Sequence, residues 1–183
     1  MLTNGRRDLV DIGRYRTHKD AMQVVSGSIH QPKVHFEAPP SDQMKAQMDD
    51  FLAWFNGSRK LPALARAGIA HLYFVCIHPF EDGNGRIGRA IAEKAIAQSI
   101  DQPSLTALAY QIEKQRNAYY KALETANKKN ELTEWLTYFA KVILDAQETT
   151  EAHIQFLIDK TKLYDRLSGK LNTPGESAGK DVS

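Results

Sequence analysis

The sequence predicts a mainly helical, all-α domain with a small β-hairpin near its N-terminal end. Apolar residues recur at helical spacing through most of the chain from Ser41 to Leu167. An alternating segment, KVHFEA at residues 33–38, follows the turn-forming SGS and precedes a double proline, which indicates a short strand. The length of 183 residues suits one domain with a sizeable core. We therefore expect a helical domain that carries a hairpin over about residues 22–38.

The first elements follow from local signals. The hairpin is expected to turn near residues 26–32. Ser41 is a suitable N-cap for a first helix, which Asn56 and Gly57 should end. A second helix is expected over about residues 62–77, because the residue before Pro79 is disfavoured in helical geometry. The apolar face of the first helix is formed by Met44, Met48, Phe51, Leu52 and Phe55.

Further helices are expected over about residues 86–102, 104–127, 131–144 and 149–167. Residues 168–183 are polar and rich in Gly, Pro and Ser, which predicts a disordered tail. The expected organisation is one domain over 1–167 followed by this tail. The apolar face of the 131–144 helix is formed by Leu132, Trp135, Leu136, Phe139 and Ile143. We assign His71 and Tyr73 to the core.

Composition excludes several classes of protein. The formal net charge of +2 is too balanced to indicate a nucleic-acid binder. The chain has no apolar run of bilayer length and no signal-peptide pattern, so we expect no membrane span. A single cysteine, Cys76, excludes a disulfide framework and fits a reducing cytoplasm.

The stretch IHPFEDGNGRIGRA, residues 77–90, concentrates the chemistry-bearing residues. Gly83, Asn84 and Gly85 stand where a helix begins, so their backbone N–H groups can form an anion-binding nest. Arg86 and Arg89 follow one turn apart on one face. Cations are unfavourable at a helix N-terminus, so two of them there predict a ligand with several anionic oxygens. A di- or triphosphate is the natural candidate.

Two further residues complete this predicted site. Asp82 is placed to hold Mg²⁺ against the same phosphates. His78 is the one side chain of the stretch able to act as a base near neutral pH. Each has a plainer alternative: Asp82 as an N-cap, His78 as a structural residue, and the arginines as partners of surface carboxylates. All of these plainer roles would have to coincide within a dozen residues.

A dinucleotide fold is the main alternative from the residues alone. GNGRIG matches G-x-G-x-x-G, LYFVCI resembles a strand, and Asp101 follows about twenty residues later. However, LYFVCI continues the helical pattern that begins near Pro62, HPFED separates it from the first glycine, and only helices are expected downstream. The sequence therefore disfavours this fold.

The segment HPFEDGNGRIGR resembles the signature of the Fic family, H-P-F-x-[D/E]-G-N-G-R-x-x-R, at every fixed position. DIGRYRTHKDAMQVVSG, HFEAPPS, AWFN, AHLYFVCIHPF and RNAYYKALE are similar to bacterial Fic proteins with an additional N-terminal helical region. The resemblance implies a protein adenylyltransferase (AMPylase), which moves AMP from ATP to a Tyr, Thr or Ser hydroxyl of a target protein and releases pyrophosphate.

The resemblance also implies residue roles. His78 would be the general base, and Asp82 would bind Mg²⁺ between the α- and β-phosphates. Arg86 would contact the β-phosphate and Arg89 the γ-phosphate, while Phe80 would anchor the loop in the core. The remaining nucleotide-binding positions of the motif would be Gly83, Asn84, Gly85, Ile87 and Gly88.

The same resemblance assigns the hairpin as a flap that holds the target protein as an added strand. Its residues nearest the nucleotide would be Val25, Ser26, Gly27 and Ser28. Tyr119, Tyr120 and Asn127 match positions that face the adenosine. For the two tyrosines, helix packing is a nearly equal alternative.

The inhibitory pattern of many Fic proteins, [S/T]-x-x-x-E-[G/N], does not occur in the sequence. We therefore expect a truncated form, a minimal core, or a protein inhibited in trans by a separate segment or antitoxin. Two other functions stay open: a nucleotide-binding interaction module without turnover, and removal of AMP or transfer of another phosphate-linked group from the same site.

Overall fold

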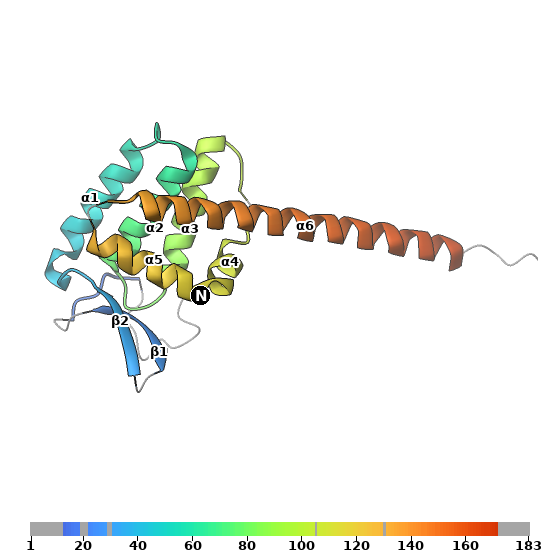
Figure 1. Ribbon diagram of the computed structural model, residues 1–183. Helices are drawn as coiled ribbons and strands as arrows, with labels where there is room; N and C mark the ends of the chain where they lie inside the picture. Colours follow the sequence, from blue (N-terminus) through green and yellow to red (C-terminus); the bar gives the residue numbers. More distant parts are fainter. Residues whose placement is uncertain (1–12, 19–21, 29–30, 105, 130, 172–183) are drawn as a thin grey trace, which may run out of the picture.

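The computed structural model describes residues 13–18, 22–28, 31–104, 106–129 and 131–171, and the structural statements below concern these residues. They form a helical body with a hairpin at one end and a long helix that projects from it (Figure 1). The elements are β1 Gln23–Ser28, β2 Gln31–Glu37, the 3₁₀ turn η1 Ser41–Gln43, α1 Met44–Gly57, α2 Ala63–Ile77, α3 Asn84–Ile100, α4 Leu108–Lys114, α5 Arg116–Lys128 and α6 Thr133–Leu171.

The predicted hairpin is confirmed. Strands β1 and β2 pair antiparallel, with Gln23 opposite Glu37 and Ser28 opposite Gln31, and the register shifts between Val24 and Val25. The two residues between the strands lie outside the described part of the chain. Strand β2 packs against α5, so the hairpin is attached to the helical body by one of its strands.

Helix α2 lies at the centre of the body, where it contacts α1, α3 and α6. Its contact with α3 is close, because a Cβ built on Gly88 would lie 3.0 Å from Val75 Cγ2. Trp135 of α6 is 1% exposed and donates from Nε1 to the Gly68 carbonyl of α2 at 2.9 Å. Helix α2 is therefore held by α6 in its first half and by α3 near the end that leads into the predicted site.

Two predictions about helix number are wrong. The helix expected over 104–127 is divided into α4 and α5, because Gln115 departs from helical geometry with φ −113° and ψ 29°. The helices expected over 131–144 and 149–167 are one continuous helix, α6, which contains no proline or glycine before Gly169. It ends at Leu171, past the expected domain end, and residues 172–183 lie outside the description.

Smaller corrections concern helix starts and faces. Ser41 begins η1, whose N-cap is Pro40, and no side-chain cap bond is present there. Leu52 is 46% exposed and does not share the buried face of α1. Helix α3 starts at Asn84, two residues before the expected Arg86. The four other predicted apolar residues of α1 and the predicted core residues Trp135, Phe139 and Ile143 of α6 are buried.

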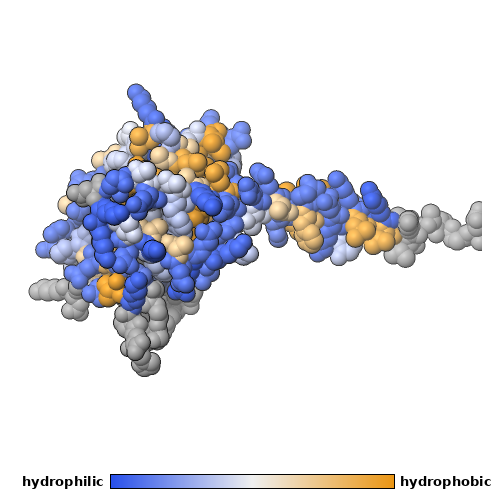
Figure 2. All heavy atoms as spheres, in the orientation of Figure 1, coloured by the Kyte–Doolittle hydropathy of each residue, from blue (hydrophilic) through white to orange (hydrophobic). Residues whose placement is uncertain are grey.

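Helix α6 changes character along its length. Gln111 of α4 donates from Nε2 to the Asp145 carbonyl at 3.0 Å and to Thr149 Oγ1 at 2.6 Å, which ties α4 to the inner half of α6. From Glu151 to Ser168 every residue is exposed, including Phe156 at 61% and Tyr164 at 57%. Figure 2 shows apolar atoms along this projecting part. None of the described helices is long and apolar enough to cross a membrane.

Candidate active site

The end of α2 fixes both the backbone and the tautomer of His78. His78 N donates to the Phe74 carbonyl at 3.1 Å, and His78 adopts left-handed geometry with φ 51° and ψ 58°. Pro79 has no N–H, so it cannot complete the next helical bond to the Val75 carbonyl. His78 Nδ1 lies 3.3 Å from that carbonyl oxygen. Because a carbonyl only accepts, Nδ1 carries the proton and Nε2 is free to accept one.

The surroundings of His78 keep the imidazole neutral. Burial lowers the pKa of His78 below its usual 6.5, the Val75 carbonyl offsets part of this effect, and the positive charge of Arg16 lowers the pKa further. A neutral imidazole with a free Nε2 is the form that a general base requires.

The loop after His78 is braced from inside. Asn84 is 2% exposed, accepts from Phe80 N at 3.0 Å and donates to the Phe80 carbonyl at 2.6 Å. The Phe80 ring packs against Tyr15 and Phe74, with centroid separations of 5.7 and 6.3 Å. Phe80 thus anchors the loop as predicted. The Asn84 amide has a bracing role here, and its contact with a phosphate stays a prediction.

Helix α3 begins with a glycine in left-handed geometry and a charged pair. Gly83 is the N-cap residue, with φ 85°, and its N–H donates to Asp82 Oδ1 at 2.6 Å. Such a positive φ favours glycine. Arg86 Nη2 lies 2.9 Å from Asp82 Oδ2. The predicted metal ligand and the predicted β-phosphate ligand therefore pair with each other.

A cavity of about 250 Å³ brings the motif together with α4 and α5. From the motif it is lined by His78, Gly85 and Arg89; from the other helices it is lined by Val75, Ile112, Glu113, Arg116, Tyr119, Tyr120 and Leu123. A larger, apolar cavity of about 860 Å³ lies between α4 and α6, and no motif residue lines it. The smaller cavity is therefore the candidate site for a nucleotide.

Both predicted tyrosines line this cavity, but their hydroxyl and ring contacts differ. The Tyr119 hydroxyl lies 2.9 Å from His71 Nε2, and burial raises the pKa of Tyr119 and lowers the pKa of His71 to about 4. His71 is fully buried, as predicted for a core residue. The Tyr120 ring stacks on His35 of the flap at 4.8 Å. Helix packing thus accounts for the Tyr119 hydroxyl, while Tyr120 joins the cavity to the flap.

Three other predicted nucleotide ligands lie in packed surroundings. Asn127 Oδ1 accepts from Cys76 Sγ at 2.8 Å, and burial raises the pKa of Cys76 to about 12, which keeps the thiol protonated. A Cβ on Gly88 would meet His71 Nδ1 at 3.2 Å, so Gly88 serves the close packing of α3 on α2. Ile87 packs against the core. Nucleotide contacts of these residues stay predictions.

The flap is fastened to α5 next to the cavity. His35 Nδ1 lies 3.3 Å from Glu124 Oε2, and Lys33 Nζ lies 3.4 Å from the same oxygen. Val25, Ser26, Gly27 and Ser28 form the outer end of β1, paired with residues 31–34 of β2. Their predicted nearness to a nucleotide stays a prediction.

Sequence reasoning did not identify Glu113, Arg116 and Arg16. Glu113 and Arg116 line the cavity from the α4–α5 break, which no glycine or proline signals. Arg16 is 1% exposed, yet it stands in a polar segment where an arginine ordinarily lies on the surface.

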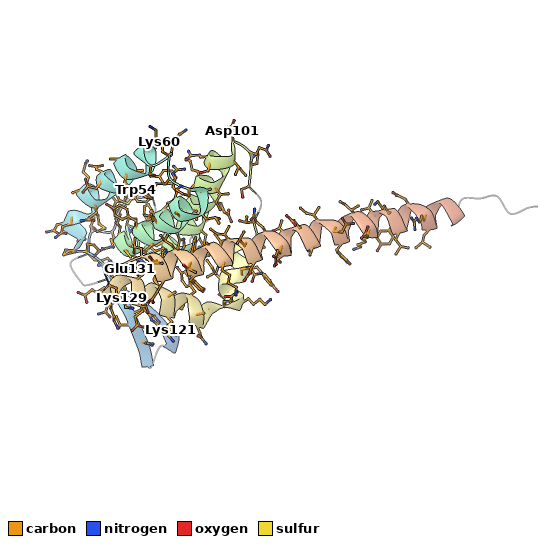
Figure 3. The ribbon with its side chains drawn as sticks, turned by 45° about the horizontal axis from the view of Figure 1, so that its top comes forward. Trp54, Lys60, Asp101, Lys121, Lys129 and Glu131 are labelled. Carbon is orange, nitrogen blue, oxygen red and sulfur yellow. The ribbon has the colours of Figure 1, made fainter. Side chains whose placement is uncertain are left out.

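The dinucleotide alternative is wrong, because residues 63–77, which include the supposed strand LYFVCI, are helical. Asp101 and Lys60 stand on the side of the body away from the hairpin (Figure 3).

The donor set fits Mg²⁺ only if a phosphate shares it. Among the residues that the structure describes, no group of three or more His, Cys, Asp or Glu side chains could hold a metal ion. Asp82 supplies a half-exposed carboxylate, with a side-chain exposure of 47%. Mg²⁺ is commonly bound by one or two carboxylates together with substrate phosphates, and a single Asp82 matches that requirement.

The comparisons with known proteins agree with this geometry. Residues 1–96 match the Fic/DOC family. The protein adenylyltransferase fic-1 of Caenorhabditis elegans is 31% identical over 139 residues, which are 75% of this chain and 24% of that protein. The protein adenylyltransferase Fic of Drosophila yakuba is 30% identical over 80% of this chain and 26% of its own length.

Solved structures agree as well. The crystal structure of a Fic family protein from Desulfovibrio desulfuricans G20 has a TM-score of 0.67 at 30% identity, over 80% of this chain and 44% of that one. This chain spans about a quarter of the length of the two curated relatives. The family match covers more than half of this chain, and the helical fold and motif geometry accompany it. The chain therefore belongs to the Fic/DOC family.

Proposed function

We propose that this chain transfers AMP from ATP to a hydroxyl side chain of a target protein and releases pyrophosphate. The observation that carries the proposal is the placement of His78: its Nδ1 is directed at the Val75 carbonyl, and its side chain lines the same cavity as Arg89. A base and a phosphate-binding cation on one cavity suit attack of a hydroxyl on a phosphate. The two curated relatives are named protein adenylyltransferases, which supports the same reaction.

In the proposed step, the target hydroxyl oxygen attacks the α-phosphorus of ATP. The new bond joins that oxygen to phosphorus, and the bond from phosphorus to the bridging oxygen of the β-phosphate breaks. Pyrophosphate leaves with the electron pair, and the hydroxyl proton passes to His78 Nε2. Positioning and charge neutralisation supply most of the acceleration in such transfers, so the chain needs little other machinery.

The motif residues after His78 would stabilise the phosphate charge. We assign Arg86 to the β-phosphate and Arg89 to the γ-phosphate, with the backbone around Gly83 and Gly85 near the transferring group. Asp82 would hold a Mg²⁺ ion that is shared with the phosphates. When bound, that ion supplies charge neutralisation for the leaving group.

We further propose that the target protein binds along the flap. Among the described residues, one strand of the hairpin packs against α5, and we propose that the other pairs with a target segment in extended form. Backbone pairing would then give affinity with little dependence on target sequence. An inhibitory segment or antitoxin acting in trans, and a cytoplasmic location, remain predictions of the same proposal.

The test is transfer of label from α-³²P-ATP in the presence of Mg²⁺, to the chain itself and to proteins of a cell lysate. His78→Ala should lower labelling by about 10²–10⁴-fold, because it removes the base. ATP binding should change little, since the base contacts the incoming hydroxyl. His153→Ala is the matched control, because His153 is exposed on α6.

The alternatives give different outcomes. If wild-type protein binds ATP in calorimetry but transfers no label, the chain is a nucleotide-binding module. If it transfers no label but releases AMP from a modified protein, the site works in the direction of AMP removal. Wild-type labelling by His78→Ala would contradict the mechanism.

A further inference from the structure

We infer that Arg16 is the positioning residue of the active-site loop: it holds the backbone around His78 in place from a segment that precedes the flap. The inference rests on the proposed function, since it assigns a role in the same reaction. It adds a residue that lies 62 positions before the histidine in the chain.

The geometry comes first. Arg16 Nε donates to the His78 carbonyl at 2.9 Å, and its backbone N donates to the Pro79 carbonyl at 2.9 Å. Its Nη2 donates to the Pro39 carbonyl, in the segment that follows β2. One buried residue therefore bonds two successive carbonyls of the loop and a third beside the flap.

The bonds act where the backbone needs support. His78 has left-handed geometry, which is unfavourable for a residue with a side chain. Carbonyls at a helix C-terminus lack intrahelical donors and favour a nearby cation. The Arg16 guanidinium supplies both a donor and a positive charge at the end of α2. Loss of the Arg16 guanidinium would leave the His78 carbonyl without this donor, and the backbone at His78 could then relax from its left-handed geometry.

Arg16 also affects the proton affinity of the base. The groups on the cavity beside His78 are Arg89 from α3, Glu113 from α4, and Arg116, Tyr119 and Tyr120 from α5. In the adjoining loop stand Glu81 and Asp82, and Cys76 lies two residues earlier on α2. The charge that lowers the pKa of His78, in addition to burial, is that of Arg16.

Tyr15, the residue before Arg16, also holds the active-site loop. Tyr15 packs against the Phe80 ring at 5.7 Å, so residues 15 and 16 cover the side chain and the backbone of the loop together. His78 is consequently held at its imidazole by the Val75 carbonyl and at its backbone carbonyl by Arg16. A displacement of the base by about 1 Å can cost about 10²-fold in rate.

Two substitutions separate the effect of the Arg16 hydrogen bonds on the position of the loop from the effect of its charge on the His78 pKa. Arg16→Gln removes the positive charge and the fork of donors, whereas Arg16→Lys keeps the charge and removes the fork. Arg59→Gln is the control, because Arg59 is exposed in the turn that follows α1, outside the active-site loop. The measurements are kcat and KM for ATP across pH, ATP binding by calorimetry, and the His78 pKa by NMR of the imidazole.

For Arg16→Gln we expect kcat to fall by about 10–100-fold, with ATP affinity changed by less than about 3-fold. The His78 pKa should rise, since a repelling charge is gone, and the acidic limb of the pH profile should move to higher pH. For Arg16→Lys we expect a similar fall in kcat with little movement of the pKa. Arg59→Gln should match wild type in every measurement.

The outcomes distinguish this inference from the proposed function. A wild-type kcat and an unmoved His78 pKa in Arg16→Gln would overturn the inference. If the wild-type chain transfers no AMP, the NMR titration still decides whether Arg16 controls His78, so only the function fails. If Arg16→Gln does not fold, Arg16→Lys decides: wild-type kcat there overturns the inference, and a loss with retained ATP binding supports it.

Discussion

Asp82 and Arg86 form an ion pair across the first turn of α3, with Oδ2 and Nη2 separated by 2.9 Å. Both side chains are partly exposed, at 47% and 36%, so the pair contributes at most about 1 kcal/mol to stability. The same two residues are expected to bind Mg²⁺ and the β-phosphate. On that expectation, nucleotide binding would exchange this ion pair for contacts with Mg²⁺ and the β-phosphate.

Asp82→Asn should separate stability from activity. We expect the melting temperature to stay close to that of wild type, because an exposed pair contributes little. Transfer of AMP should fall strongly, because the amide does not replace a carboxylate as a Mg²⁺ ligand. The readouts are thermal unfolding and α-³²P labelling over a Mg²⁺ series. Asp49→Asn, which breaks the exposed pair with Lys45 on α1, is the control and should change neither. Unchanged labelling by the Asp82 variant would show that Asp82 is not a Mg²⁺ ligand.

Arg89→Ala should weaken binding of ATP more than binding of ADP. Arg89 lines the cavity and is assigned to the γ-phosphate, which ADP lacks. Losing one charge-assisted contact costs about 1.5–3 kcal/mol, or roughly 10–150-fold in affinity for ATP. Calorimetry with both nucleotides measures the difference. Arg86→Ala, by contrast, should weaken both nucleotides similarly. Equal losses for ATP and ADP in Arg89→Ala would place this arginine elsewhere.

Gly88→Ala should destabilise the fold. The new methyl group would lie 3.0 Å from Val75 Cγ2 and 3.2 Å from His71 Nδ1, so α3 has to move from α2. Overpacking of this kind costs about 1–3 kcal/mol, which chemical denaturation measures. Gly57→Ala is the matched control, because nothing lies within 4 Å of its Cβ position near the end of α1. A Gly88 variant as stable as wild type would show that the two helices separate without cost.

Glu124→Gln should loosen the flap and change its response to acid. The pKa of Glu124 is lowered from 4.5 to about 2, first by the hydrogen bond from Lys128 and then by that from His35. A lowered carboxyl pKa gives stability that is complete above pH 4.5 and is lost as the pH falls toward 2. The variant should lose this dependence. Its labelling of target proteins should fall more than its affinity for ATP, because Glu124 holds β2 and does not line the nucleotide cavity.

Denaturant titrations at pH 7 and pH 3, compared between wild type and Glu124→Gln, provide the measurement. Glu134→Gln is a suitable control, because Glu134 pairs with Lys129 on the surface at the start of α6. An equal fall in stability between the two pH values for Glu124→Gln and wild type would exclude this carboxylate as the source.

The parts of the site that the sequence predicted are those that are local in the chain. The end of α2 before Pro79, the glycine-rich turn and the start of α3 within two residues of the expected one all lie in one short stretch, where turn chemistry and helix capping decide geometry. The break at Gln115 and the burial of Arg16 depend on contacts with distant residues. The Asn84 amide shows the same limit, since the family resemblance implied a phosphate ligand, whereas its hydrogen bonds to Phe80 give it a bracing role.

Helix α6 is one element by geometry, but its two halves differ in what protects their backbone amides from exchange with solvent. The inner half is buried against α2 and held to α4 at Asp145 and Thr149. From Glu151 onward every described residue up to Ser168 is exposed, so the helix depends there on helical propensity and on pairs one turn apart such as Gln155–Asp159, and an isolated helix of this length is marginal in water. Hydrogen–deuterium exchange should therefore show slow amides up to about Thr150, exchanging only on global unfolding, and rapid exchange beyond it. The boundary would mark the end of the cooperative folding unit some twenty residues before the helix itself ends.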